Sequence, residues 1–264
     1  MKRTVSAHIV CDIDAPANLV FSVAAAANVS LASERVEYLY NGHPITPVDI
    51  LDVHGTRLHE FDAEAGRLTL NYWAEVDGSA AQAPVTKNDL ITYLRPSRYC
   101  ESDTLLPTAR SEFRGLSGRM LLDSVSSWVG EKLNYVPGSS LPTDGAIQTL
   151  LSRRGVCRDY AHLVITLLRG LDIPARLVSV YAPGLSPMDF HAVAEAFVDG
   201  EWFIIDATAL APRQSLVRIA TGRDAADTAF LTNHGGWLTL RELEVTATAD
   251  ALPLDDTREL VQLH

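Results

Sequence analysis

The dipeptide Asp199-Gly200 places the strongest constraint on how this chain can fold. It stands between two runs rich in apolar, aromatic and β-branched residues, within DFHAVAEAFVDGEWFIIDAT at 189–208. A two-residue type I′ turn needs positive φ at both positions, which Asp and Gly accept, so the segment is predicted to form a β-hairpin. With such a loop, paired residue numbers sum to 399, and Val193 is expected to face Asp206.

This register predicts an interaction between the two strands of the hairpin. His191, Asp206 and Thr208 fall on one face, and His191 and Asp206 are diagonal neighbours at roughly 5–8 Å. The carboxylate can therefore accept the imidazole N–H, whereas a slip of one residue would place the two side chains on opposite faces. A histidine in a strand is more often a structural residue, and an aspartate at a strand end is more often a cap. The pair alone therefore does not establish a site.

Cys157 supplies a reactive group that such a pair could serve. In RRGVCRDYAHLVITLLRG, at 153–170, it follows Gly155 in the first turn of an apolar helix. Backbone N–H groups at a helix N-terminus and a nearby imidazolium both stabilise a thiolate. Cys157 is thus the predicted nucleophile, with His191 as the acid–base group and Asp206 as the group that orients the imidazole. The alternative is a buried, inert thiol.

Four further residues are candidates for supporting roles. Acyl transfer needs donors for an oxyanion: the N–H of the nucleophile is one, and Tyr135 or Trp128 could supply another. Asp159, in the helix of the cysteine, is a candidate neighbour of the site, although a structural role is favoured. Glu195 has the strand parity of His191 and could anchor it, and a buried ion pair with an arginine is an equal alternative.

The periodicity of the chain predicts an α+β protein with two domains, at 1–105 and 106–264. The first reads as short strands with turn signals between them, which indicates an antiparallel sandwich-like domain. Its last expected strand is 89–94, and the segment 16–30 is open between helix and strand. The second domain shows helical spacing of apolar residues at 117–138, at about 144–153 and from Gly155 to about Arg169, followed by a strand at 175–182.

Charge and cysteine content argue against several functions. The net charge of −11 repels phosphate backbones, so no nucleic-acid partner is expected. No apolar run approaches the ~18 residues of a membrane span, and no signal sequence is recognised, so no membrane association and a cytoplasmic location are expected. The three cysteines lack CxxC spacing, so neither a disulfide framework nor a metal site is predicted, and no cofactor is implied. Cys11 and Cys100 are expected to be inert, and the oligomeric state stays open.

Three motifs, in this order, resemble the bacterial branch of the transglutaminase-like superfamily. They are GVCRDYAHL at 155–163, FHAVAEAF at 190–197 and WFIIDAT at 202–208; GRDAADTAF at 222–230 is similar to a segment that follows the core. The resemblance covers about 117–232 and extends more weakly to the N-terminal strands. It implies a papain-like core, with helices packed on an antiparallel sheet, and a Cys–His–Asp triad. The triad residues fall on Cys157, His191 and Asp206.

The resemblance also implies acyl transfer through a thioester. The favoured function is a cysteine hydrolase, a peptidase or amidase that acts on a peptide or protein substrate. Transfer to a primary amine and a non-catalytic protein-binding module are alternatives, because the superfamily includes all of these. The sequence has HAV at 191–193 where many relatives have His-Ala-Trp, and DAT at 206–208 where others have Asp-Pro-Thr. Neither departure removes a triad residue, and no acidic loop resembles a calcium site.

Overall fold

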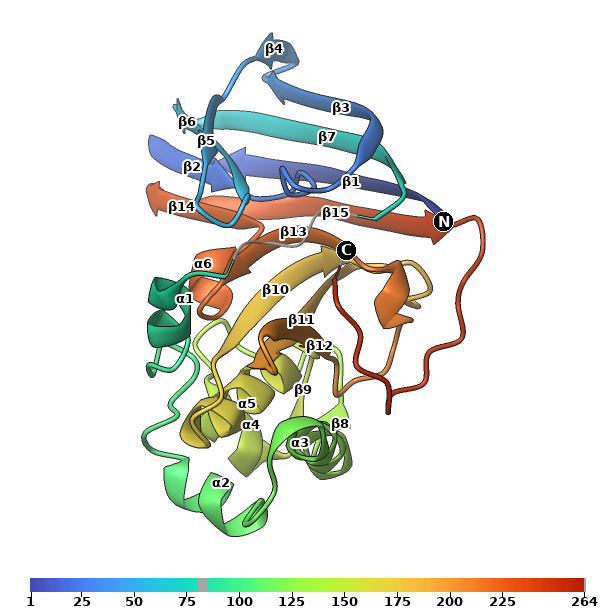
Figure 1. Cartoon of the computed structure of the whole chain (residues 1–264). Helices are drawn as coiled ribbons and strands as arrows, with labels where there is room; N and C mark the ends of the chain where they lie inside the picture. The colour runs from blue at the N-terminus through green and yellow to red at the C-terminus, as the bar shows by residue number, and fades with distance from the viewer. Residues whose placement is uncertain (80–84, 264) are drawn as a thin grey trace.

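The computed structural model describes residues 1–79 and 85–263, which form an α+β protein (Figure 1). Strands make up one end of the molecule, and most of the helices gather at the other, around a separate sheet. The expected fold class, helices packed on an antiparallel sheet after a sandwich-like set of strands, is confirmed. No helix within the described ranges is long and apolar enough to cross a bilayer.

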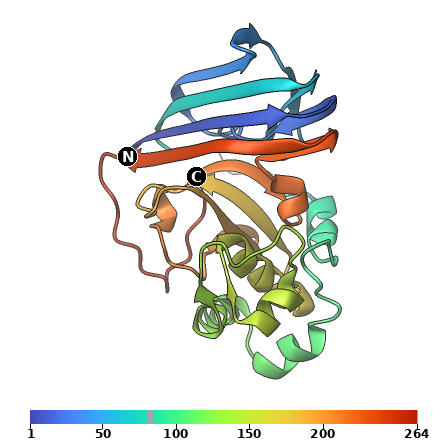
Figure 2. The same cartoon turned by 180° about the vertical axis from the view of Figure 1, so that it is seen from behind.

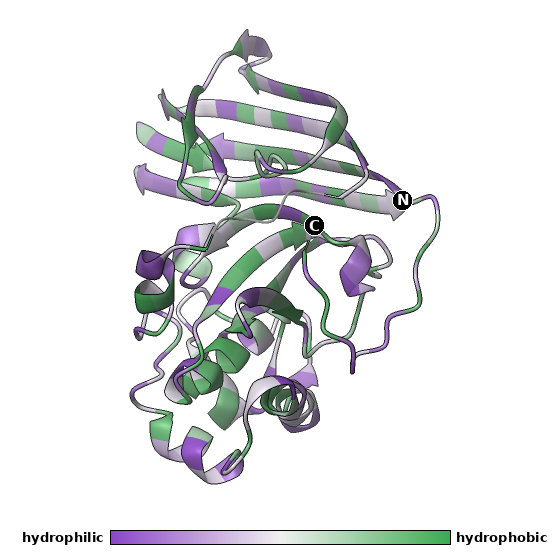
Figure 3. Ribbon diagram, viewed as in Figure 1, coloured by the Kyte–Doolittle hydropathy of each residue, from purple (hydrophilic) through white to green (hydrophobic). Residues whose placement is uncertain are grey.

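Two sheets form the part of the molecule that we call the sandwich. Its strands are β1 (Lys2–Ile13), β2 (Ala17–Phe21), β3 (Leu31–Tyr40), β4 (His43–Ile45), β5 (Val48–Leu51), β6 (Arg57–Ala63), β7 (Gly66–Asp77), β14 (Leu231–Gly235) and β15 (Leu238–Ala249). One sheet has the order β15-β1-β7-β3-β4 and the other β14-β2-β6-β5. Alternate residues face the core, as the two-residue period of a strand requires; Val5, Ala7 and Ile9 of β1 are buried. Figure 3 shows the same alternation as bands of hydropathy.

The last two strands return to the sandwich from the far end of the sequence. β15 pairs antiparallel with β1 along its length, and the two lie side by side in Figure 2; β14 pairs with β2. Residues 231–249 therefore lie in the sandwich and not with the second domain expected at 106–264. Cys100 and Leu105, from the expected first domain, pack instead in the helical core. Sequence periodicity identifies a strand such as β15 but not its partner, so the expected boundaries of 1–105 and 106–264 do not follow the packing.

The helices pack around a second four-stranded sheet, which we call the core sheet. Its order is β12-β11-β10-β13, from β10 (Ala175–Tyr181), β11 (Phe190–Val198), β12 (Glu201–Ile205) and β13 (Val217–Gly222). The helices are α1 (Lys87–Thr92), α2 (Leu106–Glu112), α3 (Gly118–Lys132), α4 (Ala146–Ser152), α5 (Cys157–Gly170) and α6 (Ala225–Thr228), with a 3₁₀ turn at Arg213–Ser215. A short parallel pair joins β8 (Asn134–Tyr135) to β9 (Arg154–Gly155).

Helix α5 is the centre of this half and packs against β11. Its residues Leu163, Val164 and Leu167 are inaccessible to solvent and lie in one cluster with Leu122 and Val125 of α3. Burial of apolar side chains on this scale contributes about 1.5–3 kcal/mol each. The helix is thereby held rigidly, and its first residue is Cys157.

Two expected elements differ in the structure. Residues 89–94 were expected to form a strand, which is wrong, because helix α1 begins at Lys87. A capping box favours the helix: Asp89 N–H donates to Thr86 Oγ1 at 3.1 Å, and Thr86 N–H donates to Asp89 Oδ2 at 3.2 Å. The helix expected at 117–138 ends at Lys132, because the chain then pairs with β9.

Placement of β15 in the sandwich predicts different effects for two neighbouring substitutions. Ala247→Asp should lower the free energy of unfolding by about 3 kcal/mol, because the side chain of Ala247 is buried and a charge there has no partner. Thr248→Asp, on the exposed face of the same strand, should change it by less than about 0.5 kcal/mol. Urea denaturation measures both, and equal effects would contradict the position of β15.

Candidate active site

The β11–β12 hairpin has the register that the sequence predicts. Val198 pairs with Glu201 and Ala194 with Ile205, so paired residue numbers sum to 399. Asp199 and Gly200 form the turn with φ of 52° and 90°, which is the positive-φ pair that a type I′ turn needs. The end of β12 therefore lies beside Ala194 of β11, and Asp206 continues from there toward His191.

His191 and Asp206 meet at this end of the hairpin. His191 Nε2 lies 2.9 Å from Asp206 Oδ2, and both side chains are buried. The other carboxylate oxygen, Oδ1, accepts bonds from the Thr208 backbone N–H at 2.9 Å and from its hydroxyl at 2.6 Å. Thr208 thus holds the carboxylate in place. The register places Thr208 on this face, but its sequence position alone does not reveal this role.

The environment of the pair favours its charged form. Burial by itself would lower the pKa of His191, but the Asp206 carboxylate, and after it Cys157, outweigh burial and raise this pKa to about 10. Burial likewise opposes ionisation of Asp206, yet His191 and Thr208 hold the pKa of its carboxyl group below the ordinary value. His191 Nδ1 has no hydrogen-bond partner in the described part of the chain. Since Nε2 is bound to Asp206, Nδ1 is the ring nitrogen left for proton exchange.

Cys157 is the first residue of α5, and Asp159 fixes the start of that helix. Asp159 Oδ2 accepts the backbone N–H of Val156 at 2.8 Å, and Oδ1 accepts the Ser140 hydroxyl at 2.9 Å. A Cβ at Gly155 would lie 2.7 Å from the Cβ of Asp159, so only glycine allows this approach. The structural role favoured for Asp159 is therefore what the structure shows. It positions the helix start that carries the thiol.

The thiol of Cys157 lies next to the imidazole of His191. Both residues line one cavity, and Cys157 contributes to the raised pKa of His191. All three thiols are free, and Cys157 is the one that is partly exposed, whereas Cys11 and Cys100 are fully buried. Burial raises the pKa of Cys11 to about 11 and that of Cys100 to about 12, so neither is suited to react.

Tyr135 also lies at the start of α5. The parallel β8–β9 pair sets Tyr135 opposite Gly155, two residues before the cysteine, and Val136 N–H donates to Gly155 O at 3.0 Å. Burial, and then the side chain of Cys157, raise the pKa of Tyr135 to about 12, while the Cys157 backbone N–H partly offsets them. The Tyr135 hydroxyl is therefore close to both the thiol and its backbone N–H, as a donor to a developing oxyanion needs to be.

The indole N–H of Trp128 is not placed to act as the second oxyanion donor. Its indole N–H donates to Glu112 Oε2 at 2.9 Å, and its ring packs edge-on against Phe113 and beneath the ammonium of Lys132. Helical periodicity places Trp128 on the apolar stripe of α3 but does not show toward which neighbour its N–H points. The proposal of Trp128 as an oxyanion donor is therefore wrong for this conformation.

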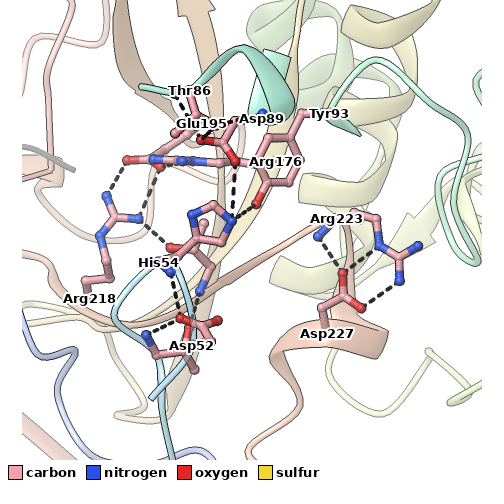
Figure 4. A network of polar contacts seen from close by, with 12 residues as sticks. Asp52, His54, Thr86, Asp89, Tyr93, Arg176, Glu195, Arg218, Arg223 and Asp227 are labelled. Atoms are coloured by element: carbon pink, nitrogen blue, oxygen red, sulfur yellow. Dashed lines mark hydrogen bonds and ion pairs between the residues drawn. The ribbon is translucent and has the colours of Figure 1, made fainter. Parts of the chain in front are cut away.

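Glu195 binds two arginines rather than His191. Arg176 Nε donates to its Oε2 at 2.7 Å, and Arg218 Nη2 donates to its Oε1 at 2.6 Å (Figure 4). The buried guanidinium of Arg176 also lies 4.0 Å from the ring centroid of Trp202. Burial opposes ionisation of Glu195, but the two arginines outweigh it and lower its pKa to about 2. The alternative of a buried ion pair is thus correct, and the anchoring role for His191 is not.

The cavity next to Cys157 includes residues that sequence reasoning did not assign to the site. It has a volume of about 330 Å³. Its further lining includes Ser22, Tyr99, Phe190, Ala225, Ala229 and Phe230. The motif GRDAADTAF at 222–230 supplies three of these residues, so its resemblance to a known segment was the available signal. Ser22 belongs to the sandwich and could not have been placed without the tertiary structure.

The raised pKa of His191 predicts a pH dependence of stability. Its folded-state pKa, about 10, exceeds the ordinary value of 6.5, so its stabilising contribution is complete below pH 6.5 and is lost as the pH rises through 10. Asp206→Asn removes the main cause of the raised pKa of His191. The free energy of unfolding of this variant should therefore fall less steeply between pH 6.5 and 10 than that of the wild type. Urea denaturation at several pH values tests this, and parallel curves for the two proteins would rule it out.

The chain is similar to several known proteins. The sequence pattern described as "Transglutaminase-like superfamily" matches residues 120–207. A crystal structure of a candidate cysteine protease from Cytophaga hutchinsonii is 33% identical in sequence and superposes with a TM-score of 0.89, covering 98% of this chain and 95% of that one. An uncharacterized protein of Mycobacterium leprae is 24% identical over 71% of this chain and 68% of its own length.

An uncharacterized protein of Mycobacterium tuberculosis is 32% identical over 123 residues, which are 40% of this chain and 39% of that protein. This chain thus spans about two fifths of the M. tuberculosis protein. The match to the C. hutchinsonii structure, by contrast, extends over the sandwich and the core sheet together. With the family pattern over the segment that carries Cys157, His191 and Asp206, these findings show that the chain belongs to the transglutaminase-like superfamily.

Proposed function

We propose that this protein is a cysteine hydrolase that cleaves peptide or amide bonds through a thioester. The observation that carries the proposal is the shared cavity of Cys157 and His191, with the imidazole bound through Nε2 to Asp206 at 2.9 Å. Peptides or proteins are the proposed substrates. A transfer of the acyl group to a primary amine would use the same intermediate and is distinguished below.

In the proposed first step, the thiolate of Cys157 attacks the carbonyl carbon, and the π electrons move to the oxygen. The Cys157 backbone N–H and the Tyr135 hydroxyl donate to this oxyanion. His191 carries its proton on Nδ1, gives it to the leaving nitrogen, and the C–N bond breaks to leave a thioester and a free amine. Asp206 keeps the imidazole in orientation throughout, because its carboxylate is held by Thr208.

In the second step, neutral His191 accepts a proton from water through Nδ1 as the water oxygen attacks the thioester. The C–S bond then breaks, the carboxylic acid is released, and the thiolate–imidazolium pair forms again. If a primary amine attacks instead of water, the product is a new amide. A fluorescent primary amine that enters the product in place of water would identify this second activity.

Selective alkylation tests the role of Cys157. Iodoacetamide at neutral pH should modify Cys157 at least 100-fold faster than Cys11 or Cys100, because both of these thiols are buried and have raised pKa values. Peptide mapping by mass spectrometry gives the three rates. Cys157→Ala should reduce hydrolysis of any accepted peptide or amide by about 10⁴-fold or more. Unchanged turnover in this variant would end the proposal.

Removal of the Tyr135 hydroxyl tests the oxyanion donor. Tyr135→Phe should reduce kcat by about 10–10³-fold with little change in KM, because the bond forms as charge develops on the oxygen. Tyr160→Phe is the matched control: its ring packs 5.9 Å from that of Tyr135, and the substitution also removes only a hydroxyl. Equal kinetics for the two variants would show that Tyr135 has no such role.

A further inference from the structure

The cavity beside Cys157 has walls from both halves of the molecule. Leu177, Phe190 and Ala192 come from the core sheet, whereas Ser22 directly follows sandwich strand β2 and Phe230 directly precedes sandwich strand β14. Ser22 N–H donates to Phe230 O at 3.0 Å, so these two residues form one continuous edge. The active-site thiol therefore faces a pocket that the core sheet does not complete without the sandwich.

An aromatic stack makes the wall of the cavity at Phe190 and Phe230 rigid. Phe190 stacks on Phe230 with ring centroids 5.3 Å apart, and Tyr181 lies 5.5 Å from Phe190. Tyr181 in turn stacks on Tyr72 of β7 at 6.0 Å, and its hydroxyl donates to Val23 O at 3.0 Å. Because Tyr72 and Tyr181 are buried in the core of the sandwich, the wall cannot move away without disturbing that core.

The lining of the pocket is mostly apolar. Its apolar lining includes Leu177, Phe190, Ala192, Ile219, Ala225, Ala229 and Phe230. Its one arginine, Arg158, donates from Nη2 to Leu141 O at 2.7 Å and to the Ser140 hydroxyl at 2.6 Å, whereas its buried Nε has no hydrogen-bond partner in the described part of the chain. The volume of about 330 Å³ is at the lower end of the range of ligand pockets, roughly 300–1,000 Å³, and suits one large side chain with its adjoining backbone.

We infer that this pocket selects a large apolar side chain, aromatic or long aliphatic, in the acyl part of the substrate, and that the sandwich is one of its specificity-determining walls. This inference rests on the proposed function, because it assigns the substrate class of the same thiol. An occupant of the pocket lies against Cys157, so its acyl carbon is brought to the sulfur. A lysine side chain is excluded, because no carboxylate is among the described lining residues and the ammonium would lose its hydration beside Arg158 without gaining a counter-ion.

Peptide amides that differ in one acyl-side residue test the selectivity. Values of kcat/KM for Phe and Leu should exceed those for Ala and Lys at least tenfold. Ala229→Leu fills the pocket from its partly exposed rim and should reduce kcat/KM for the Phe substrate at least tenfold while it changes that for the Ala substrate less than twofold. The control Ala226→Leu is exposed on α6 outside the lining and should leave the preference intact.

Equal kcat/KM for Phe and Ala substrates, or an equal loss for both in Ala229→Leu, would overturn the inference. Ala225→Leu, which also lies in the lining, replaces Ala229→Leu if circular dichroism shows that the latter is unfolded. Ala225→Leu should likewise reduce kcat/KM for the Phe substrate and leave kcat/KM for the Ala substrate nearly unchanged.

A second measurement separates this inference from the proposed function. Chloroacetamide and N-benzyl chloroacetamide both alkylate thiols, and their rates at Cys157 are normalised to their rates with glutathione. The pocket predicts at least tenfold faster labelling by the benzyl reagent, with the preference lost in Ala229→Leu and kept in Ala226→Leu. This result without hydrolysis of any substrate would refute the proposed function and leave the pocket supported. Equal normalised rates would refute the pocket, whatever the turnover.

Discussion

The hydrogen bond between His191 Nε2 and Asp206 Oδ2, 2.9 Å long, depends on the register of one hairpin. That register is set by a two-residue turn whose Asp and Gly accept positive φ. A shift of one residue would turn the carboxylate to the other face of the sheet. The contact between His191 and Asp206 is therefore set by local turn chemistry, and the remaining elements bring a thiol to it.

The thiol is brought there by the rigid burial of α5 and by the Asp159 cap at its start. The buried face of α5 anchors the helix axis, and Asp159 binds the backbone of Val156 immediately before the cysteine. Gly155 allows the carboxylate to approach. These contacts hold the cysteine in place at the N-terminus of the helix, where backbone N–H groups favour an anion. The cavity next to the thiol lies between this helix start, the core sheet and the sandwich.

Local signals made the hairpin, α5 and most of the sandwich strands predictable from sequence. The prediction of a strand at 89–94 was wrong, because a capping box begun by Thr86 outweighed the β-branched pattern. The pairing of β15 with β1 joins residues more than 200 positions apart in the sequence, and no local pattern records it. The same limit applies to the partners of Trp128 and Glu195, since periodicity gives the face of an element but not the neighbour across it. Ser22 lines the cavity because the sandwich packs beside the core sheet, and this packing is not visible in the sequence around Ser22.

The proposed function depends on activation of the Cys157 sulfur by His191. The most direct measurement is the rate of Cys157 alkylation by iodoacetamide at pH 6 in the wild type and in His191→Asn, with circular dichroism to verify the fold of the variant. The rate should fall at least tenfold in the variant, because no imidazolium is left beside the sulfur to favour the thiolate. An unchanged rate in a folded variant would contradict it.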